Sequence, residues 1–276
     1  MFRTAARTGL KCCRCYSTSP ATLPATPHPA LSLIPSFLSR TEQAILLRHS
    51  LRLLDSPSRT TSLGRKKRRE WMKANTSWAP EQGFMADEAY AWEEAHFDGV
   101  ISQYREMLVR EGAWGEAGER GGELAEVLDK VYSLLPPRHT PPSASPPLPS
   151  PASSSTLSPP PHLIMHLLHL SSRGSIRPHV DNLEAFGRQI VGISLGGERV
   201  LRFKQVSEPP EEERDGPEEF EVLVPPGSAF LHGEPLRTHY THEVLETADW
   251  EGREVGGTQR LSVMLRDRLP SSTTPL

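Results

Sequence analysis

The sequence has few cysteines, few aromatic residues and no long apolar run. Its three cysteines, Cys12, Cys13 and Cys15, all lie at the start of a 276-residue chain. The rest of the chain therefore offers no disulfide, thiolate nucleophile or thiolate metal ligand. No stretch approaches the 18 consecutive apolar residues of a membrane-spanning helix. Apolar residues make up only 36% of the chain, which contains 27 prolines and 20 glycines, so part of it is expected to lie outside any core.

Acidic residues are absent from the first 41 positions, and the first carboxylate is Glu42. The same segment carries five basic residues, Arg3, Arg7, Lys11, Arg14 and Arg40, among frequent Ser and Thr. This composition is typical of a mitochondrial presequence, with a disordered basic tail as the alternative. A cut near Tyr16 removes four of these charges and takes the formal net charge from −3 to −3 − 4 = −7. The body of the protein is therefore acidic.

Three sequence patterns predict helices in the first half. Ser39 and Glu42 have capping-box spacing, which predicts a helix that ends near Ser56-Pro57. Apolar residues at helical spacing predict two more helices, over 93–110 and 124–135, that pack on the outside of a sheet.

A basic run, Arg65 to Arg69, follows the first predicted helix. Such a run could contact a phosphate backbone or act as a nuclear address, and more often it is a solvated loop or helix end. Trp71 and Trp78 follow it, so a basic and aromatic RNA-binding surface stays open as an alternative.

The second half alternates short apolar runs with turn signals. Strands are expected over 163–170, 190–195, 199–206 and 220–224. Residues 136–161 hold eleven prolines and are interpreted as an insertion within one domain. The acidic stretch 207–219 is expected to be a long hairpin loop. Short strands at this spacing predict a mainly β fold with flanking helices, built on a two-sheet jelly roll (double-stranded β-helix).

His179 and Asp181 offer a pair of metal ligands. In an extended segment, residues two apart point to the same side, so this His-x-Asp places an imidazole next to a carboxylate. Two histidines and one carboxylate on one face of an iron leave positions open for oxygen and a co-substrate. His239 and His242 are both candidates for the third ligand, and spacing alone does not choose between them.

The run from Arg260 to Arg266 predicts a strand with two unlike faces. Leu261, Val263 and Leu265 alternate with Arg260, Ser262, Met264 and Arg266. The apolar side is a core face, and the other side carries two guanidinium groups. Since arginine forms paired hydrogen bonds with a carboxylate, this face suggests a bound anion; an exposed strand with solvated arginines is the alternative.

The order His-x-Asp, His, Arg-x5-Arg resembles the AlkB-type 2-oxoglutarate/iron(II) dioxygenases, and in particular their mitochondrial branch. The resemblance covers roughly residues 34–270 and rests on five segments, Tyr90-Ala-Trp-Glu-Glu-Ala-His-Phe-Asp98, Arg173-Gly-Ser-Ile-Arg-Pro-His-Val-Asp-Asn182, Val224-Pro-Pro-Gly-Ser228, Thr241-His-Glu-Val-Leu245 and Gln259-Arg-Leu-Ser-Val-Met-Leu-Arg266. It implies one cupin-like dioxygenase domain over 31–270, after a presequence and lead (1–30) and before a short tail (271–276).

The resemblance also implies the chemistry. His179, Asp181 and His242 would hold iron(II) as the catalytic centre, and Arg260 and Arg266 would hold 2-oxoglutarate, with Arg260 on its distal carboxylate. With O2, such a site hydroxylates or oxidatively demethylates its substrate. The branch further implies the mitochondrial matrix, a monomer, and a role in fatty-acid metabolism or regulated necrosis. A protein or metabolite is favoured as substrate; an RNA or DNA demethylase and a non-enzymatic, metal-bound scaffold are the alternatives.

Besides His239, which could compete with His242 as the ligand, two positions depart from the family pattern. Phe230 stands where the family often has a tyrosine whose hydroxyl helps to bind the co-substrate. This position is therefore expected to line the co-substrate site without that hydrogen bond. Ser175 replaces a bulkier residue beside the His-x-Asp motif. The remaining histidines of this half, His162, His166, His169 and His232, are interpreted as structural or surface residues.

Overall fold

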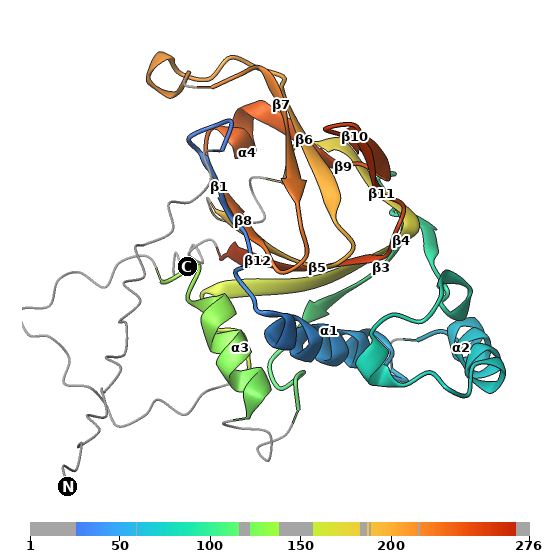
Figure 1. The fold of residues 1–276 in the computed structure, drawn as a ribbon. Coiled ribbons are helices and arrows are strands. Elements are labelled where there is room, and N and C mark those ends of the chain that lie inside the picture. The colour runs from blue at the N-terminus through green and yellow to red at the C-terminus, as the bar shows by residue number, and fades with distance from the viewer. Residues whose placement is uncertain are drawn as a thin grey trace, which may run out of the picture.

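A computed structural model describes residues 26–58, 60–115, 122–137, 157–182, 187, 189–214 and 216–268. In these residues a twisted, ten-stranded antiparallel sheet rolls up on itself, with the helices of the first half of the chain on one outer side (Figure 1). The sheet contains β1 (Leu31–Ile34), β2 (Glu93–Ala95), β3 (Ile101–Val109), β4 (Leu163–His179), β5 (Ile190–Gly196), β6 (Arg199–Gln205), β7 (Glu219–Val224), β8 (Ala229–His232), β9 (Tyr240–Val244) and β12 (Arg260–Asp267). A separate hairpin pairs β10 (Thr247–Trp250) with β11 (Arg253–Gly256).

The strand order forms the two walls of a jelly roll. The order is β1-β8-β5-β12-β4-β9-β6-β7, with β3 pairing the other edge of β4. The first half of β4 pairs with β12, and its last residues pair with β9. β4 therefore belongs to both walls, and the predicted jelly-roll fold is confirmed.

Side-chain alternation gives the roll an outer and an inner core. On β12, Leu261, Val263 and Leu265 join the outer core under the helices. Arg260, Ser262, Met264 and Arg266 occupy the opposite face of this strand, as predicted. That face looks into the roll, where Phe203, Phe220, Phe230 and Tyr240 form much of the inner core. A polar site on this face is therefore enclosed by apolar walls.

Two helices cover the outer core. The helix α1 (Arg40–Leu54) begins with the predicted capping box, in which Ser39 and Glu42 bond reciprocally. The helix α3 (Glu123–Tyr132) confirms the prediction for 124–135 and packs beside α1. The basic run lies inside α2 (Ser62–Ala74), away from the roll in Figure 1. The remaining helices are η1 (Pro80–Gln82), η2 (Asp87–Ala89), η4 (Glu211–Glu213) and α4 (Leu236–His239).

The prediction of a helix over 93–110 is wrong, because this stretch contains the strands β2 and β3. Phe97, one of the apolar residues of this stretch, is 93% exposed at the turn between the two strands. The pairing of β3 with β4 is irregular between Ser102 and Tyr104, and Gln103 adopts a φ of 51°. This bulge puts an extra residue into the strand, so the apolar residues no longer alternate along the sequence. Their spacing then imitates a helix.

The other strand predictions are confirmed, in β4, β5, β6 and β7. The acidic stretch 207–219 connects the antiparallel strands β6 and β7, as predicted for a hairpin loop. Most of 136–161 and the whole of 1–25 fall outside the described residues. No helix among those the structure describes is long and apolar enough to cross a membrane.

Candidate metal centre

Strand pairing brings His179 and His242 together although 62 intervening residues separate them. His179 ends β4, and His242 lies directly opposite it on β9. Their ring centroids are 4.2 Å apart. The backbone of β4 ends at His179, and Asp181 follows in the next loop with only 7% of its surface exposed.

The three side chains form a cluster with metal-binding geometry. One ligand atom from each of His179, Asp181 and His242 lies within 4.8 Å of the others. Within the described ranges this is the only cluster of at least three such groups found. It contains the two histidines and one carboxylate that non-haem iron prefers.

The hydrogen bonds of the cluster leave lone pairs facing inward. Nδ1 of His179 lies 2.9 Å from the carbonyl oxygen of Arg177, and because a carbonyl only accepts, Nδ1 carries the proton. Nε2 of His179 is therefore the ring nitrogen that is available to a metal. Asp181 Oδ2 is buried without a hydrogen-bond partner among the described residues, and it lies 3.8 Å from Nε2 of His242. Burial, and next the repulsion that a second protonated ring at His179 would exert, lower the pKa of His242 well below its usual value, so the His242 ring is neutral at neutral pH. A cation placed between these atoms satisfies them all, and the residues fit a divalent metal.

The structure separates the two candidates for the third ligand. His239 lies in α4, and its Nδ1 is 2.9 Å from the hydroxyl of Ser207. It is not part of the cluster, whereas His242 is. The geometry therefore favours the His242 that the family resemblance also selects.

The two predicted anion-binding arginines occupy different parts of the inner face. Arg266 reaches the cluster, with Nη2 3.5 Å from Asp181 Oδ1. Arg260 is 2% exposed; its Nε donates to the hydroxyl of Ser194 at 2.9 Å, and its buried Nη2 has no partner in the described part of the chain. Burial, followed by the nearby charge of Arg199, lowers the pKa of Arg260 to about 9. An enclosed guanidinium with a free N–H group fits the carboxylate of a bound dicarboxylate such as 2-oxoglutarate.

Phe230 lies on the same inner face and is 5% exposed. A Cβ atom on Gly192 of the neighbouring strand would come within 2.1 Å of the Phe230 ring, so glycine is required there. The ring thus packs flat on β5. It offers no hydrogen bond to a ligand.

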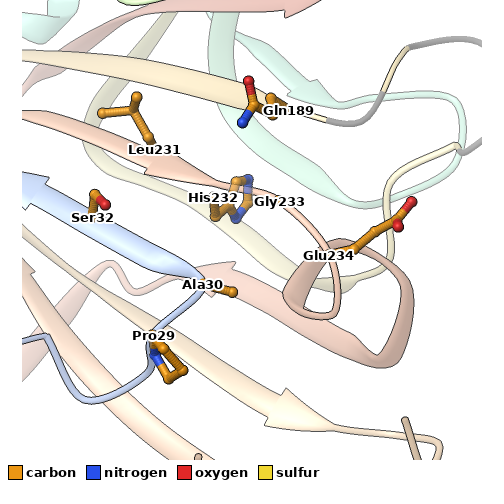
Figure 2. Close-up of a pocket in the computed structure, with 8 residues that line it drawn as sticks. All are labelled: Pro29, Ala30, Ser32, Gln189, Leu231, His232, Gly233 and Glu234. Atoms are coloured by element: carbon orange, nitrogen blue, oxygen red, sulfur yellow. The ribbon is translucent and has the colours of Figure 1, made fainter. Parts of the chain in front are cut away.

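Sequence reasoning missed two residues beside the cluster. Arg237, in α4, is 3% exposed, and its Nη2 donates to the carbonyl of Asn182, the residue after Asp181, at 3.3 Å. His232, interpreted from sequence as structural or surface, is buried with its ring 5.3 Å from that of His242. Burial, and then the repulsion that a protonated His242 would exert, lower the pKa of His232 to about 3. His232 also lines a cavity of about 640 Å³ between β1, Gln189 just before β5, and β8 with the loop after it (Figure 2).

Two of the other histidines have hydrogen-bond partners inside the fold. His169 is fully buried between Arg105 and Gln259, with a hydrogen bond of 3.0 Å to each. Nε2 of His162 lies 3.0 Å from the carbonyl of Leu135. Burial, and next the charge of Arg266, lower the pKa of His166 to about 4. No spacing rule in the sequence distinguishes these histidines from His242.

Known proteins of similar sequence match much of the chain. The family model of the 2OG-Fe(II) oxygenase superfamily matches residues 30–266. The alpha-ketoglutarate-dependent dioxygenase alkB homolog 7, mitochondrial, of Mus musculus is 28% identical over 186 residues, which cover 67% of this chain and 68% of that protein. The protein of the same name from Bos taurus is 33% identical over 113 residues, which cover 40% of this chain and 48% of that protein.

Two solved structures are more distantly similar. OsALKBH1 aligns with a TM-score of 0.43 and 14% identity, covering 88% of this chain and 100% of that chain. A prolyl-4-hydroxylase from Pseudomonas putida aligns with a TM-score of 0.40 and 15% identity, covering 87% of this chain and 93% of that chain.

Proposed function

This chain belongs to the 2OG-Fe(II) oxygenase superfamily, and from that premise we propose that it is a mitochondrial dioxygenase whose iron(II) is held by His179, Asp181 and His242. The observation that carries the assignment of residues is the convergence of three ligand atoms within 4.8 Å, with a buried carboxylate oxygen that has no other partner among the described residues. Bound iron(II) supplies the oxidation of a substrate C–H bond by O2, coupled to the conversion of 2-oxoglutarate to succinate and CO2.

The protein's own residues prepare this site. The carbonyl of Arg177 fixes the ring of His179, and Arg266 holds the carboxylate of Asp181 from the other side. Arg260 is the proposed partner of the distal carboxylate of 2-oxoglutarate, deeper in the roll. Leu168 and Leu170 of β4 lie on the same inner face and help to exclude water, which strengthens every charge interaction there.

We infer that the substrate is a protein or a small metabolite rather than a nucleic acid. The acidic β6–β7 connection is anchored next to the strand of His242, because Val206 donates to the carbonyl of His239 at 2.9 Å and Tyr240 donates to that of Pro217 at 3.1 Å. Its glutamates at 208, 211, 212 and 218 would repel a phosphate backbone. The basic residues of α2 lie on the outside of the roll (Figure 1).

The location of the protein is proposed to be the mitochondrial matrix. Two relatives carry the word mitochondrial in their names, and the first 41 residues combine basic residues with a complete lack of acidic ones. N-terminal sequencing of the chain from purified mitochondria is expected to start near residue 17. An intact Met1 would contradict import with cleavage.

The proposed activity is tested by measuring succinate formation from 2-oxoglutarate with iron(II) and O2, in the presence of separate candidate protein, metabolite and nucleic-acid pools. Asp181→Ala is expected to abolish both metal binding and succinate formation. His239→Ala serves as the matched control, since it removes an imidazole outside the cluster. Full turnover by Asp181→Ala would refute the site, and modified nucleosides as the only products would favour the demethylase alternative.

A further inference from the structure

The basic run of the sequence takes no part in the metal centre and lies in α2. This helix holds six basic residues and one acidic residue, whereas acidic residues outnumber basic ones in the chain as a whole. It stands at one edge of the molecule, away from the roll (Figure 1). Gly64 is its only buried residue. The helix is therefore a basic and largely exposed element of an acidic protein.

One side of α2 is fixed against the rest of the protein. Arg68 forms an ion pair of 2.7 Å with Asp55. The half-buried ring of Trp71 packs against the small buried cluster around Tyr90. A Cβ atom at Gly64 would come within 2.8 Å of a side chain in the turn before α2. Because a helix turns by about 100° per residue, these three positions of α2 lie within about 60° of one another and define its inner side.

The opposite side of α2 carries a basic stripe, made up of Arg65, Lys66, Arg69 and Lys73. All four are exposed and lie within about 100° of one another around the helix. Arg69 and Lys73 form no ion pair with another residue that the structure describes. Lys66 lies 3.9 Å from Glu70 in an exposed pair, which contributes little, and Arg65 donates to carbonyl oxygens of the preceding turn rather than to a carboxylate. The stripe therefore keeps most of its positive charge for a partner.

Two exposed apolar side chains flank the basic stripe. Leu63 and Met72 are 56% and 42% exposed. The helical period places Met72 beside Arg65 at one border of the stripe, and Leu63 beyond Lys66 at the other border. When the stripe faces a surface of lipid head groups, these two side chains meet the head-group layer at either edge of the contact. Basic residues combined with exposed apolar residues on one short helix are typical of helices that lie at a membrane surface.

We propose that α2 binds the surface of a membrane that contains anionic lipids, with the basic stripe against the head groups. The attraction between a Lys or Arg side chain and such a surface acts within about 10 Å at physiological salt, so acidic residues farther from the membrane oppose it only weakly. A single-stranded RNA fits less well. It would need exposed aromatic rings for stacking, and Trp71 and Trp78 instead pack edge to face against each other at 5.8 Å. The exposed apolar residues of α2 are aliphatic, which suits lipid better than a base.

The test is co-sedimentation of the full chain with phosphatidylcholine vesicles that contain about 30% phosphatidylglycerol, and with vesicles of phosphatidylcholine alone. Binding is expected to the anionic vesicles only and to weaken as the salt concentration rises. Arg69→Gln/Lys73→Gln is expected to lose about tenfold or more in vesicle affinity, the effect of removing two charges from the contact. Leu63→Gln/Met72→Gln, which keeps every charge, is expected to weaken vesicle binding about threefold or more.

The matched control, Arg110→Gln/Arg173→Gln, removes two exposed charges outside α2 and is expected to change vesicle affinity by less than about twofold. Equal binding to neutral and anionic vesicles, wild-type affinity in the Arg69/Lys73 variant, or an equal loss in the control would overturn the proposal. Tighter binding to a duplex RNA than to the anionic vesicles, lost in the Arg69/Lys73 variant but kept in the Leu63/Met72 variant, would also overturn it and make the stripe a nucleic-acid surface.

Two features of this experiment keep its result specific to α2. The basic residues before Cys15 are the same in every variant, so differences between the variants report the helix alone. An unchanged midpoint of thermal unfolding shows that each variant is folded. Vesicle binding needs neither metal nor turnover, so a failure of the oxygenase proposal would leave the result for α2 readable.

Discussion

Replacing Arg260 by Met is predicted to have opposite effects on the free protein and on its complex with 2-oxoglutarate. In the free protein, the guanidinium is 2% exposed and is held by Ser194 through one hydrogen bond, and burial lowers its pKa to about 9. A buried charge without a matching anion destabilises the fold, and an apolar side chain of similar length relieves that penalty. The midpoint of thermal unfolding of the ligand-free protein is therefore expected to rise.

The complex should be weakened by the same change. Removing one partner of a desolvated, hydrogen-bonded charge pair costs about 2–5 kcal/mol, which corresponds to a loss of affinity of roughly 30- to 5,000-fold. Arg260→Lys should recover only part of this, because a single ammonium cannot replace the two parallel hydrogen bonds of the fork. Metal affinity should be unchanged, since Arg260 does not contact the cluster of His179, Asp181 and His242 in the described structure.

The assay is calorimetric titration of 2-oxoglutarate into the Mn(II)-loaded wild-type, Arg260→Met and Arg260→Lys proteins, together with thermal unfolding with and without the ligand. Unchanged affinity for 2-oxoglutarate in Arg260→Met would refute the assignment of the distal carboxylate. A large fall in the stability of the ligand-free variant would refute the view that this charge is unbalanced before the ligand binds.

Four further outcomes are expected. His242→Ala should abolish metal binding, measured by metal content after dialysis, while His239→Ala retains it; the reverse pattern would exchange their roles. Phe230→Tyr should tighten 2-oxoglutarate binding by about 0.5–1.5 kcal/mol in a calorimetric titration, the net value of one hydrogen bond, and weaker binding would mean that the hydroxyl does not reach the ligand. Arg237→Gln should weaken Mn(II) binding about 10–100-fold, because Arg237 ties the residue after Asp181 to α4, and unchanged metal affinity would make it a purely structural residue. As the pH falls from 6.5 to 4, His166 should lower the free energy of unfolding by at most about 1.4 kcal/mol per pH unit, because its ring binds a proton in the unfolded chain but stays unprotonated in the fold. Chemical denaturation of His166→Phe should show a free energy of unfolding that depends less on pH.

Sequence patterns predicted the parts of the fold that depend on interactions between residues close together in the chain. The reciprocal hydrogen bonds of Ser39 and Glu42 define the start of α1. The strict alternation from Arg260 to Arg266 assigns each side chain of β12 to a face. Both signals depend on neighbours within one turn or one strand.

The β2–β3 region was not predictable in the same way. Its bulge at Gln103 depends on pairing with β4, a strand that begins 60 residues later. Without the partner strand, the disturbed alternation of apolar residues cannot be distinguished from a helical period.

The candidate site was predictable only where its residues are near in sequence. The spacing of His179 and Asp181 predicts that their side chains point to the same side of the chain. Only the pairing register of β4 and β9 shows that the side chain of His242 lies next to them. Arg237 enters the site because α4 leads into β9, and no spacing in the sequence indicates this contact.

The central claim is tested most directly by anomalous diffraction from crystals of the full chain grown with Mn(II) and 2-oxoglutarate. One strong peak is predicted within bonding distance of His179, Asp181 and His242, with a dicarboxylate extending from the ion to the guanidinium of Arg260. A peak at His239 or elsewhere, or a peak at the cluster with no dicarboxylate toward Arg260, would contradict the account.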